Sequence, residues 1–208
     1  IFEQRESPLN NITDKAFLFP NFADAQDVAK QLMNKLQNPN IQLQCNHCIA
    51  DVHSQLIADV RGENYPPFCR AIVDDKQYDA ALIATGYKPF DAHRKEELGY
   101  GIYNGVITSL EMENMIRSGK ITSHASDTPK RVVFLQCVGS RDEKTGNHYC
   151  SKLCCVTAVK QAIEIKKIHP DCDIHVFYMD LRMWGQGFEE MYRTAQSEYG
   201  IKFIRGRI

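Results

Sequence analysis

The second half of the chain alternates between short apolar runs and longer segments with helical spacing. Apolar runs of strand length lie at 131–136, 174–179 and 201–204. Between them, 151–168 and 187–198 place apolar residues three or four positions apart, as amphipathic helices do. Strands that alternate with helices over short connections predict right-handed crossovers and a parallel α/β sheet.

The first half of the chain mixes one helical pattern with several strand patterns. Residues 22–36 have helical spacing, which Pro39-Asn40 ends. Strand patterns are expected at 41–45, 49–60, 70–73 and 78–87. We expect the second and third of these to pair in a meander, and the last, YDAALIATGY, to be a buried strand that ends in Thr-Gly.

Residues 91–130 carry scattered proline, glycine and charge, and we interpret them as a connecting segment. One short helix is expected within it at 109–118. With Ser109 as the cap, no capping box is expected, because the acids at Glu111 and Glu113 miss the required position.

Composition narrows the classes of function. The 208 residues are 43% hydrophobic, enough for one good core or two small ones. A net charge of −1 argues against a nucleic-acid or anionic-membrane partner. No apolar run approaches the ~20 residues of a membrane span, and no signal-peptide pattern is present. Eight clustered cysteines indicate a reducing, cytoplasmic compartment with metal or redox chemistry. Because the chain opens on Ile1, we expect it to be part of a longer polypeptide.

The turn between the strand at 131–136 and the following helix carries the strongest chemical pattern. A dinucleotide-binding unit has its glycine-rich loop at this place, but here only Gly139 is present, which argues against a nicotinamide site. Cysteines stand there instead, with the spacing C-x12-C-x3-C-C: Cys137, Cys150, Cys154 and Cys155. The last two are expected in the first helical turn, capped by Ser151, where the helix dipole favours thiolates.

This cysteine set favours an iron–sulfur cluster over zinc. Four thiolates on one zinc must converge on a point about 2.3 Å from each sulfur. Adjacent helical residues such as Cys154 and Cys155 diverge by about 100°, which makes that convergence awkward. A cubane offers one iron to each thiolate and suits a splayed pair better. The alternative is that these cysteines are small buried core residues without a metal.

Weaker candidates lie elsewhere. Glu3 follows a strand-like Ile-Phe, where an acid binds ribose in a dinucleotide fold, although a surface glutamate is the plainer interpretation. Thr85-Gly86 ends an apolar run where backbone can approach a cofactor, or forms only a turn. Cys45 and Cys48 form a C-x2-C pair, which we interpret as structural because no helix follows to lower a thiol pKa.

Several phrases together resemble the A subunits of heterodisulfide reductases and their relatives in quinone-interacting membrane-bound oxidoreductase complexes. They are ATGYKPFD, LGYG-x-Y-x-x-VITSLEME, QCVGSRDE, YCSKLCC, FYMDLRMWGQGFEE and IKFIRGRI. The resemblance implies a Rossmann-like, thioredoxin-reductase-like flavoprotein core, present here as two incomplete lobes. It divides the chain into a partial FAD-binding lobe (1–90), a connecting segment (91–130) and a second lobe with the cysteines (131–208).

The resemblance also implies cofactors and their ligands. Cys137, Cys150, Cys154 and Cys155 would hold a [4Fe–4S] cluster near the flavin. FAD would meet Glu3 through its adenosine ribose, Ile49 through its adenine, and Thr85 and Gly86 through its flavin.

The family's G-x-G-x-x-G motif and ferredoxin modules are not in this chain, so we expect weak or no FAD binding by it alone. The function expected is that of an oxidoreductase part that passes electrons among the subunits of a larger complex. The alternative is a non-catalytic scaffold that docks subunits, with zinc or no metal.

Overall fold

The computed structural model describes residues 17–18, 23–45, 49–57, 68–84, 86–122 and 128–206. Its chain divides into two compact units, 1–11 with 31–88 and 12–30 with 89–208. The division into 1–90, 91–130 and 131–208 stays a prediction.

The larger unit is built on a three-stranded parallel sheet in the order β6-β7-β8. Its strands are β6 (Arg131–Leu135), β7 (Asp173–Tyr178) and β8 (Lys202–Arg205). Helices α4 (Cys154–Ile168) and α5 (Phe188–Ser197) make the two crossovers. The register pairs β6 with β7 and β7 with β8 in parallel, which confirms the strand–helix–strand–helix–strand prediction.

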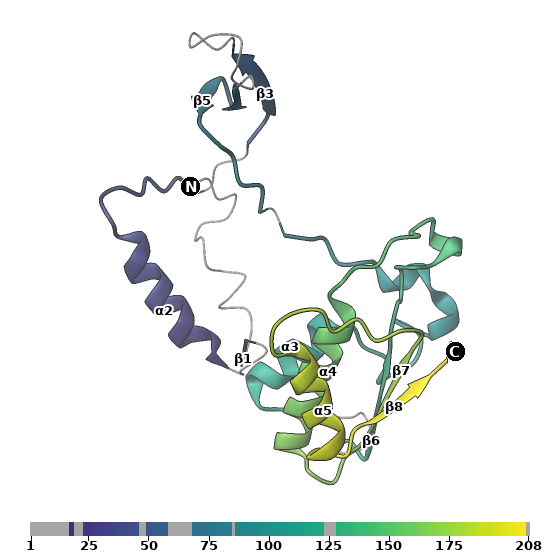
Figure 1. The fold of residues 1–208 in the computed structure, drawn as a ribbon. Helices are drawn as coiled ribbons and strands as arrows, with labels where there is room; N and C mark the ends of the chain where they lie inside the picture. Colours follow the sequence, from purple (N-terminus) through teal and green to yellow (C-terminus); the bar gives the residue numbers. More distant parts are fainter. Residues whose placement is uncertain are drawn as a thin grey trace. The chain divides into compact units, whose positions relative to one another are not determined.

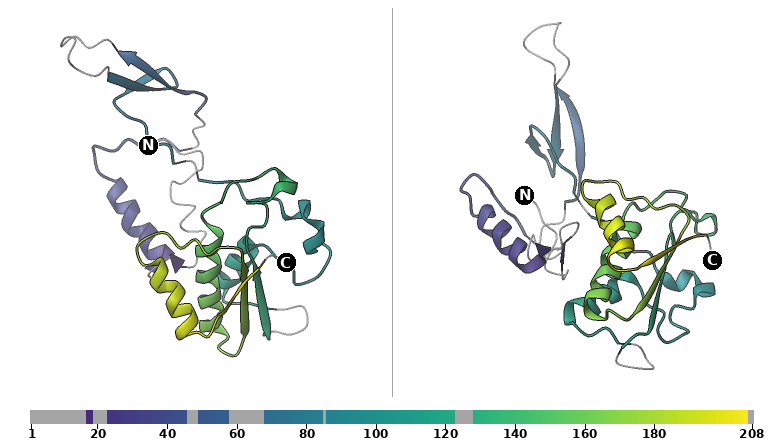
Figure 2. Two further views of the ribbon diagram at one scale, coloured as in Figure 1. Left: turned by 45° about the vertical axis from the view of Figure 1, so that its right-hand side comes forward. Right: turned by 60° about the horizontal axis from the view of Figure 1, so that its bottom comes forward.

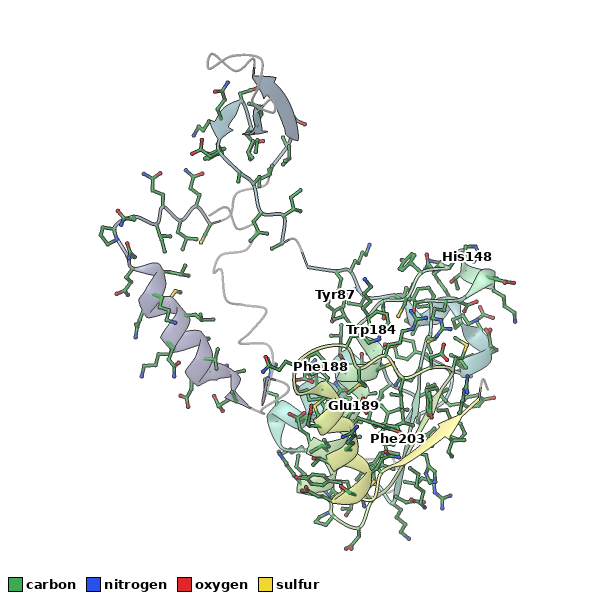
Figure 3. The ribbon with its side chains drawn as sticks, viewed as in Figure 1. Tyr87, His148, Trp184, Phe188, Glu189 and Phe203 are labelled. Carbon is green, nitrogen blue, oxygen red and sulfur yellow. The ribbon has the colours of Figure 1, made fainter. Side chains whose placement is uncertain are left out.

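Helices cover one face of this sheet, as the views in Figures 1 and 2 show for α3 (Ser109–Ser118), α4 and α5. Alternate strand residues point to that face and form the core with the helices. The fully buried members include Val159, Ile163, Ile174 and Val176. Each contributes about 1.5–3 kcal/mol through burial. On β8, Phe203 packs its ring edge-to-face against Tyr192 of α5, with centroids 4.7 Å apart (Figure 3).

Helix α4 is buried almost all round, and this includes three polar side chains. Lys160 Nζ lies 2.5 Å from Glu113 Oε1 of α3 and 3.6 Å from Glu164 Oε2. Gln161 donates from Nε2 to Glu113 Oε2 at 3.0 Å and to the Ser109 carbonyl at 2.7 Å. The α3–α4 contact therefore contains one cation and two carboxyl groups out of water.

Two details at helix starts correct the sequence predictions. Helix α3 does have a capping box, one residue earlier than the position considered above: Thr108 Oγ1 accepts from the Glu111 N–H at 3.3 Å, and Glu111 Oε2 accepts from the Thr108 N–H at 2.6 Å. Helix α4 begins at Cys154 after Leu153, so Ser151 lies outside the helix and is not its cap.

A short helix and strand pair comes before these elements. Strands β1 (Phe17–Leu18) and β2 (Ala23–Asp24) pair antiparallel. Helix α2 (Ala25–Leu36) follows at once, and Asp24 Oδ1 accepts from the N–H groups of Gln26 and Asp27 at 2.9 and 3.0 Å. This cap explains why the helix starts three residues later than the 22–36 pattern predicts.

The smaller unit contains an antiparallel meander. Strand β3 (Val52–Ile57) pairs with β4 (Phe68–Val73), and β4 with β5 (Lys76–Tyr78), which confirms the expected pairing of 49–60 with 70–73. Asp74 in the β4–β5 turn adopts φ +46° and accepts from the N–H groups of Ala50 and Asp51.

Two strand predictions in this region are wrong. Residues 41–45 form only an isolated bridge, and 79–84 form no strand. Leu82 and Ile83 are 95% and 70% exposed, where a buried strand was expected. The physical reason is that, within the described ranges, no other strand pairs with 79–84, so the apolar side chains of this segment stay in water.

Candidate metal centre at the cysteine turn

The four predicted cysteines lie around the start of helix α4. Cys137 follows β6 and is buried, and Cys155, the second residue of α4, is also buried. Cys150 and Cys154 are half-buried. The strand and the helix thus bring together residues that a loop of 12 positions separates in sequence.

The thiols interact with one another. The neighbouring Cys137 and Cys155 thiols, helped by Ser151, lower the pKa of Cys154 to about 2. The interaction with Cys154, together with burial, raises the pKa of Cys137 and of Cys155. Among these sulfurs negative charge is therefore favoured most on Cys154, at the helix N-terminus, where the helix dipole also stabilises it.

The remaining sulfur contacts are to backbone. Cys150 Sγ accepts from the Lys152 N–H at 3.3 Å, and Cys155 Sγ donates to the Asp180 carbonyl at 3.7 Å. Among the described residues, no group of three or more His, Cys, Asp or Glu side chains is arranged to hold a single metal ion. The donor set is nevertheless chemically suited to a multi-iron cluster, in which the two thiolates of α4 and the two that flank the loop would each bind one iron.

The loop from 138 to 149 is a small, well-braced structure. Asp142 and Asn147 exchange backbone hydrogen bonds of 2.9 and 3.2 Å across the short 3-10 helix η3 (Glu143–Thr145). The carboxylate of Asp142 is buried, and its Oδ2 lies 2.8 Å from Lys95 Nζ. Because these contacts brace the loop from inside, Cys137 and Cys150 are held by an ordered connection.

Three non-glycine residues near the cysteines have left-handed backbone: Cys137 (φ +61°), Arg141 (φ +52°) and Lys152 (φ +61°). Each such residue costs about 1–2 kcal/mol. Strain of this kind persists where surrounding contacts over-determine the conformation, and it gathers at functional sites. Here the three residues are Cys137 itself, Arg141 within the loop from 138 to 149, and Lys152 two residues after Cys150.

Gly139 lies in this turn because a side chain has no room there. It has φ +73°, and a Cβ at this position would overlap the ring of Phe90, over which the Arg94 guanidinium stacks at 5.2 Å. Gly146 in the same loop has a similar φ of +75°, but no atom lies within 4 Å of the position that a Cβ would take there. Alanine at Gly146 would therefore meet only the cost of a left-handed backbone, whereas alanine at Gly139 would meet that cost and steric overlap with Phe90.

We predict that Gly139→Ala destabilises the larger unit more than Gly146→Ala does. The second change should cost about 1 kcal/mol from left-handed strain alone, and the first a further ~1–3 kcal/mol from overpacking. Urea unfolding followed by the fluorescence of Trp184, the single tryptophan, measures both. Equal costs would show that the Phe90 contact does not constrain the turn.

Sequence reasoning missed two residues at this site, Arg141 and Asp180. Arg141 Nη2 donates to Asp180 Oδ2 at 2.8 Å, beside the thiols. The only signal in the sequence is a basic residue inside the cysteine loop.

The predicted FAD contacts lie partly outside the described residues. Glu3 and Thr85 fall there, and so does Cys48 of the C-x2-C pair. Ile49 is 39% exposed, and Gly86 has φ +73° with no atom near a built Cβ. These assignments stay predictions.

Comparison with known proteins identifies relatives of this chain. No protein-family profile matches the chain. The A subunit of the H(2)/formate:CoB-CoM heterodisulfide,ferredoxin reductase of Methanococcus maripaludis is 52% identical over 132 residues, 61% of this chain and 20% of that protein. The iron-sulfur A subunit of the CoB--CoM heterodisulfide reductase of Methanocaldococcus jannaschii is 53% identical over 132 residues, which are 61% of this chain and 20% of that protein.

A relative with longer coverage is the A subunit of the ferredoxin/F(420)H(2)-dependent CoB-CoM heterodisulfide reductase of Methanosarcina acetivorans. It is 38% identical over 169 residues, 78% of this chain and 21% of that protein. None of the helices in the described ranges combines the length and apolar character of a membrane span. The chain belongs to the family of heterodisulfide reductase A subunits and spans about a fifth of the length of the curated relatives it matches.

Proposed function

We propose that this chain is an electron-transferring part of an iron–sulfur and flavin oxidoreductase subunit of the heterodisulfide reductase type. Cys137, Cys150, Cys154 and Cys155 are proposed as the ligands of a [4Fe–4S] cluster. The observation that carries the proposal is the convergence of β6 and α4, which places Cys137 just after the strand and Cys154 and Cys155 in the first turn of the helix. The name of the Methanocaldococcus relative, an iron–sulfur subunit, supports the same class of cofactor.

In this proposal the protein supplies binding and charge, and the bound cluster supplies one-electron chemistry. The braced loop holds two sulfurs and the first turn of α4 holds the other two. The parent polypeptide would have a thioredoxin-reductase-like, Rossmann-like core that binds FAD through Glu3, Ile49, Thr85 and Gly86. Its partners would be the other subunits of a cytoplasmic complex.

The test is anaerobic purification followed by an absorption spectrum and by iron, sulfide and zinc analysis. We expect broad absorption near roughly 400 nm with iron and sulfide in equal amounts, as a cubane requires. A colourless protein with stoichiometric zinc would overturn the proposal in favour of a scaffold. A protein without metal after anaerobic reconstitution would favour structural cysteines.

A further inference from the structure

We infer that Arg141 sets the reduction potential of the centre at the cysteine turn, by presenting a fixed positive charge and a free N–H donor to its sulfurs while Asp180 holds its other arm. This inference rests on the proposed function. It assigns a role to a residue that supplies no ligand.

The guanidinium of Arg141 is held from one side only. Nη2 donates to Asp180 Oδ2 at 2.8 Å, whereas Nη1 is buried and has no hydrogen-bond partner in the described part of the chain. Leaving a buried donor unsatisfied is costly, and more so for a charged group. A native protein seldom leaves such a donor unused, so Nη1 is expected to have an acceptor beyond the described residues of the chain.

The acceptors that we propose for this arm are the sulfurs, because the residue that holds Arg141 also contacts one of them. Asp180, which binds the guanidinium, also accepts the Cys155 thiol on its carbonyl oxygen at 3.7 Å. The Asp180 hydrogen bond is the main cause that raises the pKa of Arg141, and the nearby Cys137 and Cys150 sulfurs raise it further. The guanidinium therefore lies near the sulfurs that flank the loop as well as near the Cys155 sulfur of the helix.

The charged groups around Asp180 carry a net positive charge. A second cation, Arg205 Nη2, lies 3.6 Å from Asp180 Oδ1, so one carboxylate faces two guanidinium groups. An oxidised [4Fe–4S] centre with four thiolates would carry a net charge of about −2 beside them, and reduction would add one more negative charge. A positive charge and a donor at the sulfurs favour the reduced state, which carries one more electron, over the oxidised state.

The experiment uses the intact protein, purified anaerobically, and the electron paramagnetic resonance signal that Cys154→Ala removes. We expect Arg141→Gln to lower the midpoint potential of that signal, with the oxidised-to-reduced ratio at a given potential rising about tenfold, which is about 59 mV for one electron. Arg141→Lys, which keeps the charge but not the forked donors, should restore part of the shift.

A matched control removes the same charge elsewhere. Arg131→Gln deletes an arginine that pairs with Asp173 at 3.4 Å, at the first residue of β6 and so at the other end of that strand from Cys137. Its potential should equal that of the wild type.

The outcomes separate two failures. If Arg141→Gln keeps its iron and its potential is unchanged, Arg141 does not set the potential. If Arg141→Gln loses iron and Arg141→Lys keeps iron at the wild-type potential, Arg141 only braces the loop, and the inference is equally overturned. If no signal depends on Cys154, the proposed function itself fails, and this inference fails with it.

Discussion

Replacing Cys154 with alanine is expected to lower the iron and sulfide bound per chain by more than about tenfold. Even the loss of a residue behind a ligand reduces metal affinity by about 10–100-fold, and Cys154 is proposed as a ligand itself. It is also the sulfur whose pKa the neighbouring Cys137 and Cys155 thiols lower. The measurement is iron and sulfide analysis after anaerobic reconstitution, beside the absorption spectrum.

The matched control for this variant is Cys172→Ala. Cys172 is buried in the core of the same unit, 2% exposed, but it belongs to the turn before β7. Removing its sulfur should lower stability without lowering metal content. The ligand assignment is wrong if iron survives alanine at Cys137, Cys150 and Cys154 in turn.

Replacing Glu164 with glutamine is expected to stabilise the larger unit above neutral pH by up to about 3 kcal/mol. Burial raises the pKa of Glu164 to about 7, and the charge of Glu113 adds to the shift while Lys160 and Lys167 oppose it. Both carboxyl oxygens lack a hydrogen-bond donor within the described residues, although Lys160 Nζ lies 3.6 Å away. An ionised Glu164 is therefore poorly compensated.

The direction follows from proton binding. The folded state keeps the Glu164 proton up to about pH 7, and the unfolded state releases it near 4.5. Between these values the folded state binds more protons, so stability falls as pH rises, and the penalty is complete above pH 7. A gap of roughly 2.5 pKa units at 1.36 kcal/mol each gives the expected ~3 kcal/mol.

Urea unfolding at pH 5 and pH 8, followed by Trp184 fluorescence, measures this effect. The gain of Glu164→Gln should be about 3 kcal/mol at pH 8 and under about 1 kcal/mol at pH 5. The control is Glu189→Gln in α5, an exposed residue 3.5 Å from Arg193. Its effect should stay within about 0.5 kcal/mol at both pH values. A gain for Glu164→Gln that is the same at both pH values would contradict the prediction.

The sheet of the larger unit could be predicted because each of its strands is indicated by a short apolar run in the sequence. Apolar runs at 131–136 and 174–179 end within one or two residues of β6 and β7, and crossover rules then leave one topology. The place of Cys154 and Cys155 at the start of α4 followed from the same pattern. Capping was missed because the pattern locates a helix to within a residue or two, whereas the Thr108–Glu111 box depends on a single position.

Other features could not be predicted because they depend on what surrounds a segment. The 78–87 run has the composition of a buried strand, but a strand forms only where a neighbour satisfies its backbone. Arg141 was missed for a related reason. Cysteine spacing suggests ligands, whereas the orientation of an arginine depends on the left-handed turn at its own backbone and on Asp180, which is distant in sequence.

The all-round burial of α4 has a consequence for the speed of electron transfer. A helix enclosed by a sheet and two other helices transmits little motion, because protein interiors are close-packed and only slightly compressible. The sulfurs at its first turn are therefore held nearly fixed. If they bind the proposed cluster, the protein around it would rearrange little when an electron arrives or leaves, the same advantage that pre-oriented dipoles give to an active site.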